Sequence, residues 1–171
     1  MKVKEIFFSL IMISTLLIFA SKDVFAQTTG VGAGVVLGAP TGIDLKFWTS
    51  NINAFDVVLG WTNDGGWERF GDGNAYYFTR SYFHFQADYL WHDFTAIRTS
   101  QRLPLYYGVG FQFDNGDALP ADFGVRGVVG LDWMPYSTPL DVFLEVAPVL
   151  YVVPSAGLGI DAGIGARFFF H

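Results

Sequence analysis

Polar and apolar residues alternate one by one over long stretches of the chain, and this is the period of a β-strand rather than that of a helix. Short segments rich in Gly, Asn, Asp and Pro interrupt these stretches, as turns do. The pattern therefore predicts eight strands, at residues 30–38, 43–49, 53–61, 77–92, 104–113, 122–134, 140–153 and 157–170.

One face of nearly every predicted strand is apolar along its whole length. In 157–170, for example, apolar residues at even positions alternate with Asp161, Gly163 and Arg167. The outer face of a soluble sandwich would carry Lys, Glu, Ser and Thr, whereas glycines with scattered charges suit the crowded interior of a narrow barrel. With lipid against the apolar face, the pattern favours an all-β fold, an eight-stranded antiparallel transmembrane β-barrel.

The stretch HFQADYLWH places His84, Asp88 and His92 four residues apart. On a helix these side chains would stack on one face and could bind a metal ion. On a strand they also share a face, but successive members lie about 13 Å apart at about 3.3 Å per residue, too far for one ion. Because the flanking segments are predicted strands, we expect a strand here, with no metal site and no cofactor.

Residues 1–26 differ from the rest of the chain. Lys2 and Lys4 precede an apolar run over residues 6–20, and Val24 and Ala26 occupy the small-residue positions before a cleavage point. We predict a cleaved secretory signal peptide at 1–26 and a single barrel domain at 27–171. The alternative is an uncleaved membrane anchor, for which the apolar run is short.

Composition narrows the function classes. The whole chain has a formal charge of −6, and cleavage after residue 26 would leave 7 basic and 14 acidic residues. This acidic balance disfavours nucleic-acid binding, which needs a basic face. The chain has no cysteine, so disulfides and thiolate metal sites are excluded.

Charged residues on the predicted inward face should form ion pairs, because a buried charge is costly without a partner. We assign to this lumen network Arg126, Glu145, Arg167, Asp132, Asp161, Arg80 and Asp88. Arg126, Glu145 and Arg167 fall on neighbouring predicted strands, and we expect them to form one cluster. The alternative is an ion path, for which a barrel of eight strands leaves little room.

The predicted outer loops are residues 62–76 and 114–121, counted from an N-terminus on the periplasmic side, and the inner turn at 93–103 is unusually long. Residues of the first loop that could bind an extracellular partner or a divalent cation are Asp64, Trp67, Glu68, Phe70 and Asp72. The alternative is an ordinary solvated loop. Pro148 lacks an N–H and predicts a bulge or a strand end. Candidates for interfacial aromatic girdles, or for plain lipid-facing surface, are Trp48, Trp61, Trp91, Trp133 and Tyr107.

Several segments resemble a family of small bacterial outer-membrane β-barrel proteins of unknown function, in the OmpA/OmpX size class. The likeness covers most of the chain after residue 26, and its most specific segments are FGVRGVVGLDW (123–133), PLDVFLEVAPVL (139–150) and GIDAGIGARFFF (159–170). The resemblance implies eight strands and the outer membrane of a Gram-negative-type bacterium. It implies no catalytic residues.

Three functions stay open at this point. The first is a structural or surface-interaction role through the outer loops, the second a narrow channel, and the third a lipid-modifying enzyme using His84, Asp88 and His92. We expect no enzymatic activity, because no serine shares the face of these residues and His92 falls at the periplasmic end of its strand. The expected partners are outer-membrane lipids, the outer-membrane assembly machinery and an extracellular molecule, with the protein itself a monomer.

Overall fold

The computed structural model describes residues 28–69, 75–116 and 119–170, and for residues 62–69, 75–81 and 119–120 it describes the backbone alone. The predicted signal peptide lies outside the described residues. No helix in the described ranges is long and apolar enough to span a membrane. The chain forms eight strands: β1 (Val31–Ala39), β2 (Thr41–Trp48), β3 (Asn53–Arg69), β4 (Ala75–Asp93), β5 (Leu105–Gly116), β6 (Leu119–Trp133), β7 (Leu140–Val153) and β8 (Gly157–Phe170).

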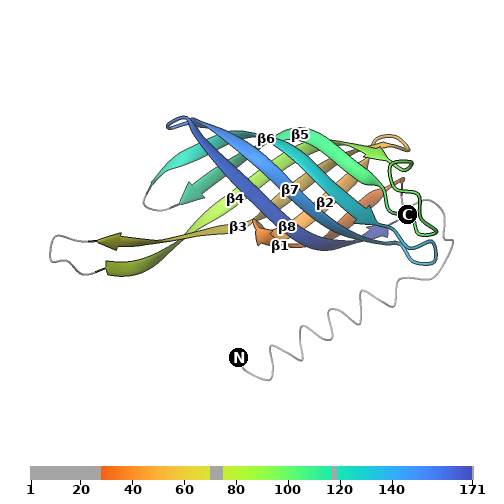
Figure 1. Cartoon of the computed structure of the whole chain (residues 1–171), viewed down its shortest axis with the longest axis horizontal. Helices are drawn as coiled ribbons and strands as arrows, with labels where there is room; N and C mark the ends of the chain where they lie inside the picture. Colours follow the sequence, from red (N-terminus) through yellow and green to blue (C-terminus); the bar gives the residue numbers. More distant parts are fainter. Residues whose placement is uncertain (1–27, 70–74, 117–118, 171) are drawn as a thin grey trace, which may run out of the picture.

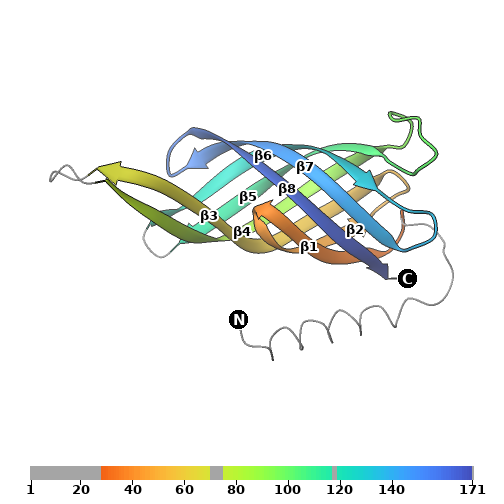
Figure 2. The same cartoon turned by 60° about the horizontal axis from the view of Figure 1, so that its bottom comes forward.

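The strands form one closed antiparallel barrel in chain order, which confirms the predicted all-β, eight-stranded antiparallel barrel (Figure 1). Each strand pairs with the next, and β8 returns to pair with β1 from Val31 opposite Phe170 to Ala39 opposite Ala162. The turns at 49–52, 94–104 and 134–139 lie at one end, which we call the turn end (Figure 2). The C-terminal ends of β1, β5 and β7 lie at the other end.

Alternation along the strands separates an interior from an exterior, because successive side chains of a strand point to opposite faces. One connected cluster of buried interior residues consists of Val36, Val58, Leu90, Tyr106, Val128, Phe143 and Ala147. The exterior of the barrel is strongly apolar, and Val109, Ile160 and Trp61 expose 57%, 75% and 60% of their surface. No Asp, Glu, Lys or Arg is exposed among the strand residues whose side chains are described.

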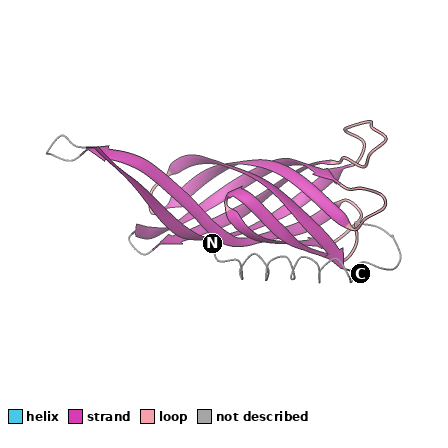
Figure 3. Cartoon of the chain, turned by 90° about the horizontal axis from the view of Figure 1, so that it is seen from below, coloured by secondary structure: helices cyan, strands magenta, loops and turns pink. Residues whose placement is uncertain are grey.

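The predicted outer loop at 62–76 is wrong for most of its length. β3 and β4 stay paired without a register shift from Asn53 opposite Trp91 to Arg69 opposite Ala75. Their neighbours stop earlier: β2 pairs with β3 only as far as Trp61, and β5 pairs with β4 only from Phe83. Residues 62–69 and 75–82 therefore form a two-stranded ribbon that projects beyond the barrel rim, and we call this the ribbon end (Figure 3).

Two smaller sequence predictions also fail. The expected loop at 114–121 is largely strand, since β5 runs to Gly116 and β6 starts at Leu119. Pro148 makes no bulge: the register is the same on either side of it, with Arg126 opposite Val149 and Val129 opposite Val146. The shift between β6 and β7 lies instead beside Phe123, near the ribbon end.

The long turn after β4 is fixed at both of its ends. Asp93 Oδ1 accepts hydrogen bonds from the Thr95 amide and hydroxyl, both at 2.7 Å, and from the Ala96 amide at 3.1 Å. The Arg102 carbonyl accepts a bond from the Met134 amide at 2.9 Å. The Met134 side chain is fully buried. The residues just before β5 therefore continue its hydrogen bonding with the end of β6.

Glycines make room for the large interior side chains. A Cβ built on Gly165 would lie closer than 3.0 Å to both the Phe143 ring and the Val35 carbonyl oxygen. A Cβ on Gly127, by contrast, would have nothing within 4 Å. Both glycines lie in strands, but only Gly165 is required by packing.

Gly165→Ala should destabilise the barrel by about 1–3 kcal/mol, the usual cost of overpacking a tight interior. Gly127→Ala is the matched control and should leave stability unchanged or slightly raised, because alanine restricts the unfolded chain. The midpoint of urea unfolding of the detergent-solubilised protein, followed by tryptophan fluorescence, measures both. Equal midpoints for the two variants would contradict the packing role of Gly165.

Candidate functional site: the charged interior

Ten charged side chains are buried inside the barrel, and carboxylates outnumber cations. The carboxylates are Asp44, Asp56, Asp88, Asp114, Asp132, Asp141 and Glu145, and the cations are Lys46, Arg126 and Arg167. The interior is therefore acidic, and most of these charges form two separate groups.

The first group surrounds Arg167 near the turn end. Arg167 donates from Nε to Asp44 Oδ1 at 2.6 Å and from Nη2 to Asp44 Oδ2 at 3.0 Å, which is a bidentate pair. It also bonds Asp141 Oδ2 at 3.1 Å and Asp56. Its guanidinium carbon lies 3.8 Å from the centroid of the Phe143 ring. One side chain of β8 thus bonds residues of β2, β3 and β7.

Lys46 extends this first group. Its ammonium lies 2.6 Å from Asp132 Oδ2 and 3.4 Å from Asp141 Oδ2. The same Asp132 oxygen lies 3.1 Å from His92 Nε2. We call the set Arg167, Lys46, Asp44, Asp56, Asp132 and Asp141 the Arg167 group.

The second group surrounds Arg126, nearer the ribbon end. Arg126 Nη2 donates to Glu145 Oε1 at 3.2 Å, and other guanidinium nitrogens lie 3.3 Å from Asp88 and 3.6 Å from Asp161. The Tyr106 hydroxyl donates to Glu145 Oε2 at 3.0 Å. We call Arg126, Asp88, Glu145 and Asp161 the Arg126 group.

Four interior contacts share the same arrangement. In each, two polar side chains on two strands meet above a glycine of the strand that lies between those two strands. Arg167 and Asp44 both lie opposite Gly34, and Asp88 and Arg126 both lie opposite Gly110. The same holds for the bonded pairs Tyr106–Glu145 over Gly130 and Gln112–Tyr151 over Gly124. A side chain at any of these glycines would occupy the space through which the two partners meet.

The structure divides the predicted lumen network. It brings Asp88, Glu145 and Asp161 to Arg126, and Asp132 to Arg167. The single cluster expected of Arg126, Glu145 and Arg167 is wrong, because Arg167 makes its described ion pairs in the other group. The Arg80 side chain lies outside the described part of the molecule.

His84, Asp88 and His92 are all buried but have three different partners. His84 Nδ1 lies 2.7 Å from Asp114 Oδ1, and its Nε2 lies 2.9 Å from Gln86 Oε1. Asp88 pairs with Arg126, and His92 contacts Asp132 of the Arg167 group. Among the described residues no group of three His, Asp or Glu side chains could hold a metal ion.

Several interior contacts have no counterpart in the sequence prediction. Gln86 accepts a bond from Arg126 Nη1. The side-chain amide of Gln112 donates to the Tyr151 hydroxyl at 3.0 Å. Asp114 had been placed in a loop. Alternation places Gln86 on the interior face together with His84 and Asp88, and the same signal could have assigned Gln112, but uncharged residues gave no reason to expect an ion-pair network around them.

The predicted aromatic girdle is wrong for Trp48, which belongs to the interior. Its ring centroid lies 4.5 Å from that of His92, and the Lys46 ammonium lies 4.9 Å from it. Trp61, Trp133 and Tyr107 are exposed on the outer surface. Trp91 is half-buried there and stacks on Tyr107, with centroids 6.0 Å apart.

The predicted binding residues at the ribbon end are only partly placed. Asp64, Trp67 and Glu68 lie on β3 in the projecting ribbon, where only the backbone is described. Phe70 and Asp72 lie outside the described residues. The structure therefore puts three of the five on paired strand rather than on a loop.

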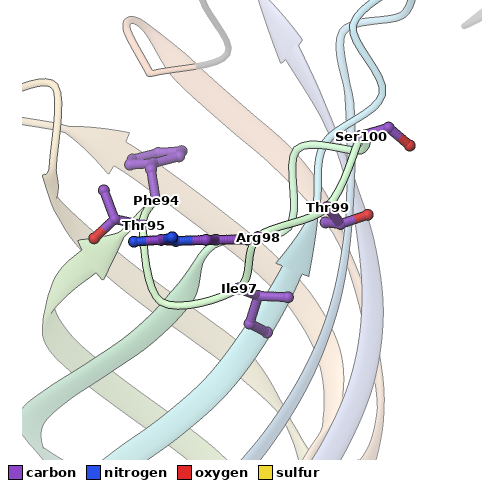
Figure 4. Close-up of a pocket in the computed structure, with 6 residues that line it drawn as sticks. All are labelled: Phe94, Thr95, Ile97, Arg98, Thr99 and Ser100. Carbon is purple, nitrogen blue, oxygen red and sulfur yellow. The ribbon is translucent and has the colours of Figure 1, made fainter.

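A shallow hollow of about 580 Å³ lies at the opposite, turn end. Its walls come from one turn and consist of Phe94, Thr95, Ile97, Arg98, Thr99 and Ser100 (Figure 4). The Arg98 side chain reaches toward Phe94 and Thr95 (Figure 4). The hollow brings in no residue of either charged group, so it is not an entrance to the interior network.

The interior is filled rather than open. Arg126, Arg167, Tyr106, Lys46 and Phe143 are each less than 2% exposed. The lining of an aqueous pore would be accessible to solvent along its length. The charged interior thus behaves as a packed polar core that ties strands together.

No family model, curated protein or solved structure matches this chain. The resemblance to small outer-membrane barrels therefore stays a prediction, and the functional argument depends on the geometry alone.

Arg167→Met should destabilise the barrel by about 3–5 kcal/mol, because it removes the cation that pairs with the buried Asp44 and Asp56 and leaves Asp141 with Lys46 alone. The control Arg98→Met removes an arginine from the exposed turn and should have little effect. Adding Asp44→Asn to Arg167→Met should restore part of the loss, since one uncompensated charge disappears. Urea unfolding midpoints of the four proteins test this, and a wild-type midpoint for Arg167→Met would refute the structural role of the group.

Proposed function

We propose that this protein is a small bacterial outer-membrane β-barrel whose filled barrel anchors a structural or surface-interaction role at the ribbon end. The observation that carries the proposal is the reversed distribution of polarity. All eight strands present exposed large apolar side chains to the outside, while the buried charges lie in the lumen. Soluble monomers rarely expose contiguous apolar patches above a few hundred Å².

Lipid is the solvent that suits such a surface. A closed barrel satisfies the backbone hydrogen bonds of every strand, which a hydrocarbon environment requires. Its strands are 8–19 residues long, so each can supply most or all of the roughly 9–11 residues that a tilted membrane strand needs. Exposed aromatic residues such as Trp61 and Trp133 lie toward opposite ends of the barrel, as interfacial anchors do.

The filled interior favours anchoring over transport. Passage of an ion would require displacing side chains such as Arg126 and Arg167 from several carboxylates at once. The ribbon of residues 62–69 and 75–82 extends past the rim, where a partner outside the membrane could reach it (Figure 3). We therefore place the interaction with an extracellular partner at this end.

Val109→Arg should impair insertion into lipid vesicles, because it puts a charge on the middle of the outer wall at a cost of about 2–4 kcal/mol near the bilayer midplane. Asn51→Arg adds the same charge to an exposed turn and should insert normally. Folding into vesicles is measured by the shift in gel mobility between unboiled and boiled samples. Equal insertion of the two variants, or a wild-type protein that folds in buffer without lipid, would contradict the membrane assignment.

The wild-type protein should show no steady conductance in planar bilayers, because its lumen is occupied by bonded side chains. Current recording after insertion measures this. Stepwise conductance would support a channel instead.

Mass spectrometry of membrane lipids with and without the protein should show no change in lipid masses, and a protein-dependent change would support a lipid-modifying enzyme.

A further inference from the structure

The ribbon has two free edges, and this is unusual for a protein whose other strands all close into a barrel. Among the described strands, none pairs with β3 beyond Trp61 or with β4 before Phe83. Each edge is about eight residues long, or about 26 Å at 3.3 Å per residue. Unpaired strand edges present a row of N–H and C=O groups that can pair with another chain.

The orientation of the backbone on β4 follows from one hydrogen bond and the register. The His92 amide donates to the Ile52 carbonyl at 2.7 Å, so even-numbered residues of β4 point their backbone groups toward β3. The β3–β4 register is constant from there to Ala75. Because backbone groups alternate along an antiparallel strand, the N–H groups of Tyr77, Thr79 and Ser81 point to the free edge.

The two edges differ in how well they can accept a strand. Residues 75–82 read AYYFTRSY, and aromatic residues and Thr are enriched in strands. Residues 62–69 read TNDGGWER, and Asn, Asp and Gly are depleted there. The β4 edge is therefore the better acceptor, and we refer to residues 75–82 as the acceptor edge.

The net charge at the ribbon end of the barrel indicates which kind of partner would be attracted there. The described residues there, 62–69, 75–82 and 119–122, hold three acidic and two basic residues, and the whole chain has a formal charge of −6. A partner carrying Lys or Arg would gain from this potential, chiefly in its rate of association.

A second copy of the chain is a poorer occupant than a free segment. Copies in one membrane would be kept apart by their barrels, each of which is wider than the two-stranded ribbon, whereas paired strands must approach to about 4.8 Å. An extended segment from outside the membrane meets no such obstacle.

We propose that the acceptor edge, residues 75–82 of β4, binds an extended, basic polypeptide segment by strand addition. Backbone hydrogen bonds to Tyr77, Thr79 and Ser81 supply the pairing, as in other cases of strand addition to an open sheet edge. The inference deepens the proposed function and rests on it, since it gives the mode of the surface interaction.

The test uses the full mature chain in detergent micelles and a fluorescent peptide of the sequence KVTVKVTVK as the probe. Thr79→Pro/Ser81→Pro removes two N–H groups from the free edge without removing a hydrogen bond to β3 and without changing any charge. Thr79→Ala/Ser81→Ala is the matched control, which removes the same side chains but keeps both N–H groups.

We expect the wild-type protein and the alanine variant to bind the peptide, and the proline variant to bind it at least about tenfold more weakly, from the loss of two net hydrogen bonds. Equal binding by the proline and alanine variants would overturn the proposal, because it would indicate attraction by charge alone. Absence of binding to the wild-type protein would also overturn it, as would a proline-sensitive dimer in the absence of peptide.

Amide hydrogen exchange on the wild-type protein gives a second readout that needs no folded variant. Peptide binding should slow exchange at Tyr77, Thr79 and Ser81 and leave residues 62–69 unchanged, and the reverse pattern would refute the choice of edge. The boiled and unboiled gel shift is recorded for every protein. A wild-type protein without that shift would refute the membrane proposal, while an intact shift without peptide binding would refute strand addition only.

Discussion

The structure depends on buried charges that meet across the lumen over glycine. At the seam where β8 closes onto β1, Arg167 reaches over Gly34 to Asp44 of β2 with two hydrogen bonds. Any side chain at Gly34 would collide with the backbone of β8. Strand pairing closes the sheet, and this contact links strands that are not neighbours. The cost of leaving any of these charges unpaired makes the closed register strongly preferred over a slipped one.

The same requirement explains why the barrel is filled. Each cation of the two groups contacts at least two carboxylates. The buried side chains of Tyr106, Phe143 and Gln112 fill further space inside the barrel. If the barrel lies in lipid, as we propose, a polar core of this kind contributes stability that apolar burial cannot, because apolar burial contributes little where the surroundings are themselves apolar. We therefore look for the proposed interaction with a partner outside the charged interior, in the ribbon of residues 62–69 and 75–82.

Period-2 alternation was sufficient to predict the strands, the closed barrel and the inward face of the charged residues, because each of these follows from local sequence. The partners of Arg126 and Arg167 could not be predicted, since they depend on the stagger between strands, and a shift of two residues would exchange one carboxylate for another. The ribbon was missed for a related reason. Its β3 half, with Gly65 and Gly66, resembles a turn, and it becomes strand by pairing with a strongly strand-forming segment of β4.

The filled barrel and the projecting ribbon are two consequences of one unequal sheet. Pairing of β3 with β2 stops at Trp61, and pairing of β4 with β5 stops at Phe83. This is because β2 and β5 are shorter than β3 and β4, which lie between them. In the barrel every edge is satisfied by closure, so the wall offers nothing for another chain to pair with. Among the described strands, the excess length of β3 and β4 restores two edges at one point only, at the end of the barrel opposite to Val31 and Phe170. A protein that needed only an anchor would gain nothing from sixteen residues of paired backbone outside the barrel. We therefore regard the ribbon, and its β4 edge in particular, as the part of this molecule that its interactions depend on.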